Sequence, residues 1–153
     1  MEILQKGNPI LRELSKPIDT DLYLDELISE MIDTMRKANG VGLAAPQVGH
    51  LLRLFIVLDV DALEIKRLSY ENCVTIFINP KIIRKSEQTS EFEEGCLSIE
   101  GIKGVITRPE RVMVEYQDKN LKRYVGEFDG YMSRIIQHEN DHLNGVLFTD
   151  YLV

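Results

Sequence analysis

The sequence predicts an α+β fold in which helices pack on a largely antiparallel sheet. Three observations lead to this class. Apolar residues first recur at helical spacing, within residues 21–38. Several strand-like segments follow, and the helical period returns from about residue 129. An order of helix, strands and helix, without an internal repeat, is typical of a single domain of this class.

The first helix is expected over residues 21–38. Its apolar positions share one helical face and are Leu24, Leu27, Ile28, Met31, Ile32 and Met35. The polar residues at 19–21 offer N-caps, and Asn39, followed by glycine, offers a stop. The next segment, 40–49, contains glycines and a proline, so we expect a loop there.

Two apolar runs in the middle of the chain predict buried strands, at 53–60 and 73–83. Pro80 cannot donate a hydrogen bond to a neighbouring strand and is expected to mark a bulge, an edge or a strand end. Residues 84–93 are polar, and a loop or an edge strand is expected there.

The last third of the chain predicts a hairpin followed by a helix. Residues 111–118 and 121–128 are strand-like and are separated by Lys and Asn, which favours a tight turn. The helical period then begins at about residue 129, and Gly145 is a natural C-cap.

Composition and charge exclude several classes of protein. The 153 residues are 44% apolar, and 18 basic against 25 acidic residues give a net charge of −7. An acidic chain of ordinary apolar content argues against disorder and against attraction to nucleic acid or an anionic membrane by overall charge. Because no signal peptide and no membrane-spanning stretch is visible, we expect a cytoplasmic protein with free cysteines.

The motif HExxH occupies residues 138–142 on the predicted last helix. His138 and His142 are four residues apart, so both imidazoles lie on one helical face and can bind one metal ion. Glu139 lies one position round the helix, where it can act as a general base beside that ion. The pattern is typical of a metal-dependent hydrolase. A surface helix with incidental histidines is disfavoured because both histidines continue the apolar stripe of this helix.

A catalytic site of this kind needs a third ligand. In the extended pattern HExxHxxGxxH the third histidine would fall at Phe148, which cannot bind a metal. The single carboxylate after the motif is Asp150, a weak candidate. The ligand must otherwise come from upstream, where Cys73, Cys96, His50 and several carboxylates are available.

The two cysteines differ in their surroundings. Cys73 begins an apolar strand, where a cysteine usually packs as a small hydrophobic residue. Cys96 follows Gly95, which allows a close backbone approach beside the thiol. Next to an HExxH motif that lacks its third ligand, this favours a site of Cys96 with the two histidines.

Three separated motifs match the pattern of one known family. They are GVGLAAPQ at 40–47, EGCLS at 94–98 and QHENDH at 137–142, and the opening GNPILR at 7–12 is similar to the usual start of that family. With these motifs in this order, the sequence resembles the peptide deformylases from near its N-terminus to about Leu147.

The resemblance implies removal of the N-formyl group from the N-terminal formylmethionine of new polypeptides, with release of formate. It implies Cys96, His138 and His142 as the metal ligands and Glu139 as the general base. It also implies one Fe(II) ion per chain, which Zn, Ni or Co can replace. A thiolate with two imidazoles would, by ligand preference alone, suggest Zn(II).

The resemblance further implies donors to the oxyanion and a substrate groove. The donors would be the side-chain amide of Gln47 and the backbone N–H of Leu97. The groove would be formed by residues within the first two motifs, namely Val41, Gly42, Leu43, Glu94 and Gly95. Candidate walls of the methionine pocket are Tyr131 and Ile135, with Arg134 on the same helix expected as a charged rim.

The partners implied are formylmethionyl nascent peptides, and transient association with the ribosome is allowed. No direct nucleic-acid site and no membrane contact are expected. We expect a single catalytic domain over residues 1–153, without the further C-terminal helix of many family members. Glu100 stands where the family often has proline, and this is expected to alter the rim of the site.

Two other functions stay open at this point. An HExxH peptidase that cuts internal amide bonds would share the ligands and the base. A protein with a structural metal site would need a fourth ligand, from Cys73, His50 or Asp150.

Overall fold

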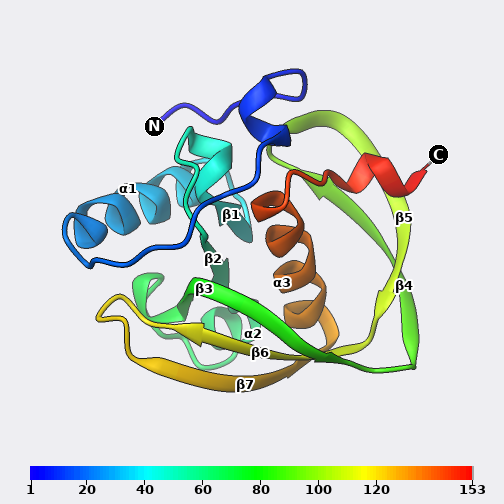
Figure 1. The fold of residues 1–153 in the computed structure, drawn as a ribbon. Helices are drawn as coiled ribbons and strands as arrows, with labels where there is room; N and C mark the ends of the chain where they lie inside the picture. The colour runs from blue at the N-terminus through cyan, green and yellow to red at the C-terminus, as the bar shows by residue number, and fades with distance from the viewer. Residues whose placement is uncertain (153) are drawn as a thin grey trace.

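The computed structural model describes residues 1–152, and its chain forms two antiparallel sheets with three α-helices (Figure 1). The strands are β1 (Gly42–Ala44), β2 (Leu54–Leu58), β3 (Val74–Lys85), β4 (Thr89–Cys96), β5 (Ile99–Pro109), β6 (Arg111–Gln117) and β7 (Arg123–Asp129). The α-helices are α1 (Leu24–Lys37), α2 (Val60–Glu64) and α3 (Gly130–Leu143). Short 3₁₀ turns are η1 (Pro9–Arg12), η2 (Ala45–Val48), η3 (Glu71–Cys73) and η4 (Phe148–Leu152). The predicted α+β class is confirmed.

The larger sheet has the strand order β1-β2-β3-β6-β7, and β4 pairs with β5 in a separate two-stranded sheet. Every one of these strand pairs is antiparallel. Helix α3 lies in the middle of the molecule, with the β4–β5 hairpin curving past it on one side and β1 and β2 on the other (Figure 1). The two sheets therefore bring separate parts of the chain to the same helix.

Strand β2 shows how the larger sheet is covered on both faces. Successive side chains of a strand point to opposite faces. Leu54, Ile56 and Leu58 belong to the hydrophobic cluster that contains the buried side of α1. Phe55 and Val57 belong to a second cluster, which contains the apolar residues of α3. Because both faces are buried, this strand has an apolar run instead of an alternating pattern.

Helix α1 begins three residues later than expected. Its N-cap position is Tyr23, which has a φ of 68° and makes no side-chain capping bond. The expected cap at 19–21 is wrong, because the hydroxyl of Thr20 accepts a hydrogen bond from the backbone of Leu22 within the preceding turn. The predicted stop is confirmed: Asn39 has a left-handed φ of 55° directly after the helix.

Some segments are more regular than the sequence indicates. The expected loop at 40–49 contains β1 and η2, which are too short to show a period. Strand β5 was not expected, because glycines interrupt its apolar pattern; pairing with β4 stabilises it over its length. The expected edge strand at 84–93 is present as the end of β3 and most of β4.

The remaining predicted elements agree with the structure. The register between β3 and β6 shifts at Ile78 to Lys81, around Pro80, as expected for a bulge. The hairpin of β6 and β7 and the last helix are confirmed within a few residues. Gly145 has a φ of 72°, and a β-carbon built there would lie 2.5 Å from the backbone oxygen of Arg12. This glycine lets the chain turn tightly after α3 and fixes η1 against the end of that helix.

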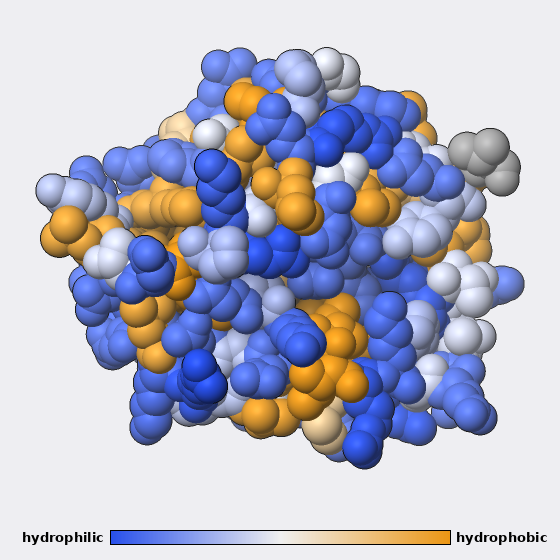
Figure 2. Space-filling model, viewed as in Figure 1, coloured by the Kyte–Doolittle hydropathy of each residue, from blue (hydrophilic) through white to orange (hydrophobic). Residues whose placement is uncertain are grey.

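The surface seen in Figure 2 is mostly hydrophilic, and hydrophobic side chains appear on it as separate groups. Within residues 1–152, no helix is both long and apolar enough to cross a membrane.

We predict that Gly145→Ala destabilises the protein by about 2–4 kcal/mol, because it combines a left-handed φ with a clash against backbone. The matched control is Gly101→Ala, where φ is 75° and a β-carbon meets nothing within 4 Å. This control should lose only about 1–2 kcal/mol. Urea unfolding in the presence of a chelator measures both, and equal losses would show that the Arg12 contact is unimportant.

Candidate metal centre

Three ligand atoms from two distant segments converge beside α3. Cys96 is the last residue of β4, and His138 and His142 lie one turn apart on α3. Their sulfur and nitrogen atoms all lie within 4.8 Å of one another. The distance from Cys96 Sγ to His142 Nε2 is 3.4 Å. The sequence-predicted trio is therefore brought together.

The alternative ligands are held elsewhere. Asp150 forms an ion pair with Arg12 at 2.7 Å and accepts a hydrogen bond from a backbone N–H of its own turn. Cys73 is buried in the hydrophobic cluster beside α1, and His50 is exposed. Among residues 1–152, the group that could hold an ion is thus the trio alone. A closed structural site with four protein ligands is not formed from these residues.

Glu94 fixes the orientation of His138. Its Oε1 lies 2.9 Å from His138 Nδ1. A carboxylate accepts the proton on Nδ1, so Nε2 is the nitrogen left to bind a metal ion, and it lies beside Cys96. Glu94 lines the cavity, as expected for a groove residue, but its carboxylate is directed into the protein.

Two buried arginines hold Glu94 in turn. Arg108 donates to it through Nε and Nη2, at 2.6 and 3.0 Å, and Arg134 Nη1 donates at 2.7 Å. Burial opposes the charge of Glu94, but the hydrogen bonds from His138, Arg108 and Arg134 outweigh it and lower its pKa to about 2. The expectation that Arg134 forms a charged rim holds only in part. Arg134 lines the cavity, but it is only 5% exposed, because Glu94 and backbone carbonyls bind its guanidinium.

The two histidines are affected differently by their surroundings. Burial lowers the pKa of His142 well below its ordinary value, so this imidazole is neutral and available as a ligand. Burial also opposes the charge of His138, but hydrogen bonds with Cys96 and Glu94 raise its pKa to about 10. A metal ion competes with the proton for Nε2, so ion binding should release protons.

Glu139 lies at the centre of the site without a hydrogen bond to its Oε1. Its Oε2 is 4.0 Å from His138 Nε2, and a β-carbon added to Gly42 would lie 2.6 Å from that oxygen. Gly42 is therefore required for the close approach of β1 to this carboxylate. Burial raises the pKa of Glu139 to about 7, although the nearby His138 lowers it in part. A carboxyl group with this pKa can accept and return a proton near neutral pH.

The side chain of Gln47 has a fixed direction. Its Oε1 accepts the backbone N–H of Ala44 at 2.9 Å. Its Nε2 therefore points to Ser98 Oγ, at 3.1 Å, and to Cys96 Sγ, at 3.5 Å. Leu97 follows Cys96 in the tight turn between β4 and β5. The Gln47 amide is thus beside the sulfur, and Leu97 is the next residue in the chain after Cys96.

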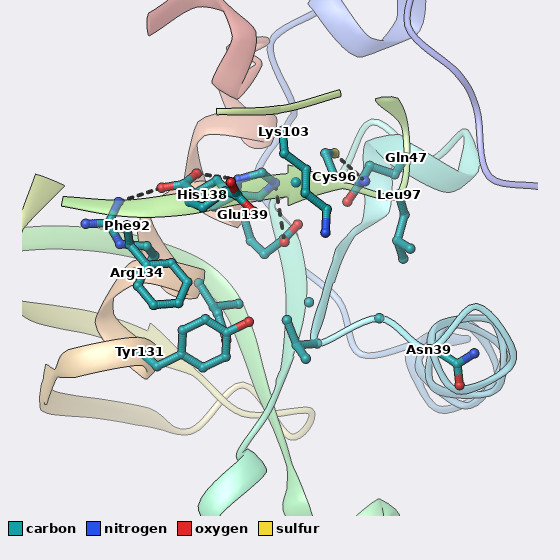
Figure 3. Close-up of a pocket in the computed structure, with 17 residues that line it drawn as sticks. Asn39, Gln47, Phe92, Cys96, Leu97, Lys103, Tyr131, Arg134, His138 and Glu139 are labelled. Atoms are coloured by element: carbon teal, nitrogen blue, oxygen red, sulfur yellow. Dashed lines mark hydrogen bonds and ion pairs between the residues drawn. The ribbon is translucent and has the colours of Figure 1, made fainter. Parts of the chain in front are cut away.

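A cavity of about 410 Å³ opens beside these residues (Figure 3). The predicted site residues that line it are Val41, Gly42, Gln47, Glu94, Gly95, Cys96, Leu97, Tyr131, Ile135, His138 and Glu139. Leu43 does not line it, and its expected place in the groove is wrong for the side chain. Since alternate residues of β1 point to opposite faces, Leu43 is directed into the core and is fully buried.

Sequence reasoning missed several residues of the site, among them Asn39, Gly40 and Glu93, which also line the cavity. Phe92 and Lys103 line the cavity, and Arg108 anchors Glu94. Phe92 could have been found, because it lies two positions before Glu94 and hence on the same face of a strand. For Lys103 and Arg108 the sequence carries no signal, since strand β5 itself was not expected.

The residues present fit a divalent metal ion. One thiol and two imidazoles are ligands of the kind that soft or intermediate metals prefer. Glu94 supplies the hydrogen bond that usually accompanies a ligating histidine. Three protein ligands with a carboxylate next to them, at the wall of a cavity, are typical of a catalytic centre with an open position.

We predict that Cys96→Ala weakens Co(II) binding by at least about 100-fold, since losing a ligand costs more than losing an outer partner, which typically costs 10–100-fold. The thiolate absorption band of the Co(II) protein reports the binding. Cys73→Ala serves as the control, because its thiol lies in the core beside α1 and should leave the affinity unchanged. If Cys73→Ala lost Co(II) affinity and Cys96→Ala did not, the thiolate ligand would be Cys73 and not Cys96.

Comparison with known proteins agrees with this geometry. The sequence model of the family described as polypeptide deformylase matches residues 1–153. The peptide deformylase of Salinibacter ruber is 47% identical over 150 residues, which are 95% of this chain and 77% of that protein. That of Treponema pallidum is 48% identical over 151 residues, covering 98% and 86%.

Solved structures give the same result. A peptide deformylase structure from Plasmodium falciparum has a TM-score of 0.90 at 36% identity and covers 98% of this chain and 85% of its own. A structure of the enzyme from Thermotoga maritima has a TM-score of 0.87 at 39% identity, covering 98% and 95%. Family model, relatives and fold agree, and the chain belongs to the polypeptide deformylase family.

Proposed function

We propose that this chain removes the N-formyl group from formylmethionyl peptides at the centre formed by Cys96, His138, His142 and Glu139. The observation that carries the proposal is the position of Glu139. Its carboxylate is buried next to His138 Nε2 at the wall of a cavity large enough for an amino-acid side chain. A site with ligands, a base and room for substrate supports hydrolysis more than a structural role.

The ion that we propose is Fe(II), one per chain, with Zn, Ni or Co able to take its place. Cys96, His138 and His142 would hold it. Bound there, a divalent ion would act as a Lewis acid and make water a stronger nucleophile near neutral pH. Because a thiolate beside Fe(II) is open to oxidation, we also propose a reducing compartment, the cytoplasm, as the place of action.

Glu139 would carry the proton through the reaction. It accepts a proton from the attacking water and then delivers one to the amine that leaves when the formyl C–N bond breaks. The products are formate and a peptide with a free amino terminus. A pKa near 7 suits both steps, since the group must be able to lose and gain a proton at working pH.

Gln47 and Leu97 would bind the negative oxygen that forms at the formyl carbon. The Gln47 amide is held by Ala44 and Ser98, so its N–H is directed beside the sulfur before substrate arrives. The backbone N–H of Leu97, next to Cys96, would be the second donor. Removing one donor of this kind typically costs about 2.7–4 kcal/mol of transition-state stabilisation.

The substrate would enter as an extended strand between β1 and β4. Gly42 and Gly95 have no side chain to obstruct its backbone, which suits recognition by strand addition. The methionine side chain would contact Tyr131, Ile135 and Phe92 in the cavity. The ring centroids of Phe92 and Tyr131 are 5.3 Å apart, and aromatic edges favour contact with a thioether.

Nascent formylmethionyl peptides are the partners that we propose, met during transient association with the ribosome. Each of the three hydrophobic clusters described in residues 1–152 packs against a residue of this site, namely Leu97, Val41 or Cys96. We therefore propose that these residues act as a single catalytic domain.

The test is formate release from a formyl-Met tripeptide by the Fe(II)- or Co(II)-loaded protein. We predict that Glu139→Gln keeps its metal and its fold but loses about 10²–10⁴-fold in kcat, the usual contribution of a general acid–base group. The control is Glu91→Gln, an exposed carboxylate on β4, which should keep the wild-type rate. Full activity in Glu139→Gln would show that Glu139 is not the general base.

The same assay separates the rival hydrolase. An enzyme specific for the formyl group should not release the acyl group from acetyl-Met tripeptide and should not cut internal bonds of an unblocked peptide. Cleavage of internal bonds at a comparable rate would instead identify an HExxH endopeptidase.

A further inference from the structure

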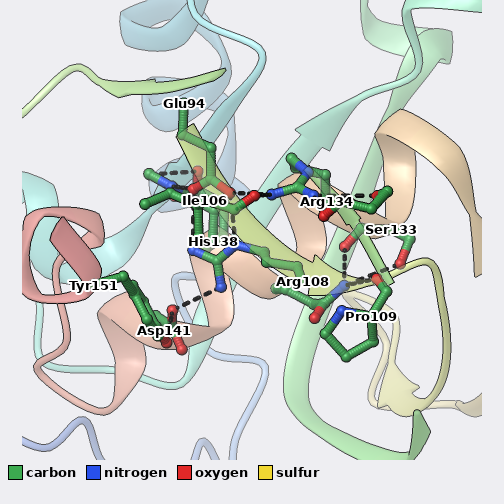
Figure 4. Close-up of polar contacts among 12 residues, drawn as sticks. Glu94, Ile106, Arg108, Pro109, Ser133, Arg134, His138, Asp141 and Tyr151 are labelled. Atoms are coloured by element: carbon green, nitrogen blue, oxygen red, sulfur yellow. Dashed lines mark hydrogen bonds and ion pairs between the residues drawn. The ribbon is translucent and has the colours of Figure 1, made fainter. Parts of the chain in front are cut away.

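The charged network behind His138 extends beyond Glu94, as Figure 4 shows. Arg108 uses one side of its guanidinium for Glu94 and the other for Asp141, where Nη1 donates to Oδ2 at 3.0 Å. Asp141 lies on α3 between the two histidine ligands. The guanidinium is planar and rigid, so the positions of the two carboxylates that it binds are coupled.

Tyr151 lies at the outer end of this network, where it contacts Asp141 and Arg108. Its hydroxyl donates to Asp141 Oδ2 at 2.8 Å, the same oxygen that Arg108 binds. The guanidinium carbon of Arg108 lies 5.0 Å from the centre of the Tyr151 ring, as in a cation–π contact. Tyr151 thus contacts both partners of the Arg108–Asp141 pair, one through its hydroxyl and one through its ring.

The charges in the network balance. Glu94 and Asp141 carry two negative charges, and Arg108 and Arg134 carry two positive ones that arginine cannot lose. All but Asp141 are nearly fully buried. Buried ion pairs are costly to disturb, because a charge left without its partner has no water to replace it. A shift of Arg108 would therefore be felt at Glu94 and, through it, at His138.

We propose that Tyr151 is a positioning residue for the metal centre, acting through Asp141, Arg108 and Glu94 to keep His138 Nε2 directed at the ion. The inference rests on the metal centre proposed above. It assigns a role to η4, whose residues are far from Cys96 in the sequence and do not line the cavity. Tyr151 would act by orienting side chains. Its hydroxyl holds the carboxylate of Asp141 in place, and that carboxylate holds Nη1 of Arg108.

A merely structural role for Tyr151 predicts something different. Leu152 packs on Gly104, so η4 is also held to β5 by apolar contact. If Tyr151 only helped this attachment, loss of its hydroxyl would lower the melting temperature and leave ion retention unchanged. If it positions His138, loss of the hydroxyl changes ion retention while the fold stays intact.

The experiment measures how fast the Co(II)-loaded protein gives up its ion to an excess of chelator. We expect Tyr151→Phe, which keeps the ring over Arg108, to release Co(II) about 2- to 10-fold faster, the effect of one hydrogen bond, with an unchanged melting temperature. Asp141→Asn, which removes a charge from the network, should accelerate release by about 10–100-fold.

The matched control is Tyr124→Phe. Tyr124 also donates its hydroxyl to a carboxylate, Asp118 Oδ2 at 3.2 Å, but on the β6–β7 hairpin. It should release Co(II) at the wild-type rate.

Equal release rates for wild type and Tyr151→Phe would overturn the proposal, as would equal acceleration in Tyr124→Phe. A wild-type protein that binds no Co(II) through Cys96 would overturn the metal centre itself, together with this inference. The two failures are therefore distinguishable.

Discussion

The hydrogen bond between Glu94 and His138 is the interaction on which the site depends. A histidine can bind a metal through either ring nitrogen, and the carboxylate decides which one is free. An ionised carboxylate in the interior would be too costly without compensation. Arg108 and Arg134 supply that compensation, and because both are themselves buried, Glu94 is held in one position. The orientation of His138 beside Cys96 thus depends on charges placed behind the candidate metal ligands.

The fold brings these residues together because helix α3 lies between the two sheets and contacts both. Strand β4 brings Cys96 and Glu94, strand β5 brings Arg108, and α3 brings both histidines, Glu139 and Arg134. The larger sheet holds α3 from its other side through the aromatic and aliphatic residues around Phe77. Glycine at position 42 lets β1 approach so closely that the carboxylate of Glu139 is confined.

The sequence predicted the chemistry better than the architecture around it. The proposed ligands, the proposed base and Gln47 lie in recognisable motifs, and cysteine and histidine are scarce in this chain, with two and three residues. The structure places these side chains together. Helical and alternating periods located α1, α3 and the β6–β7 hairpin. They could not locate β5, whose glycines break the pattern and whose pairing with β4 is decided in three dimensions.

What the sequence failed to predict has one cause, because it concerns contacts between residues that lie far apart in the chain. Arg134 was expected at a charged rim because it lies on the same helix as the candidate pocket walls, yet its partners are backbone oxygens and Glu94, which no local pattern reveals. The coupling of Tyr151 to Arg108 joins residues 43 positions apart and has no motif. Buried charge networks depend on long-range contacts, so they become visible only once the fold is known.

In the proposed centre, one sulfur and two imidazoles, from β4 and α3, hold a single ion. X-ray absorption at the metal edge of the Zn-loaded protein tests it most directly. We expect one sulfur at about 2.3 Å, and two imidazole nitrogens at about 2.0–2.1 Å within a shell of light atoms. A spectrum with no sulfur, or with two, would contradict the ligand set of Cys96, His138 and His142.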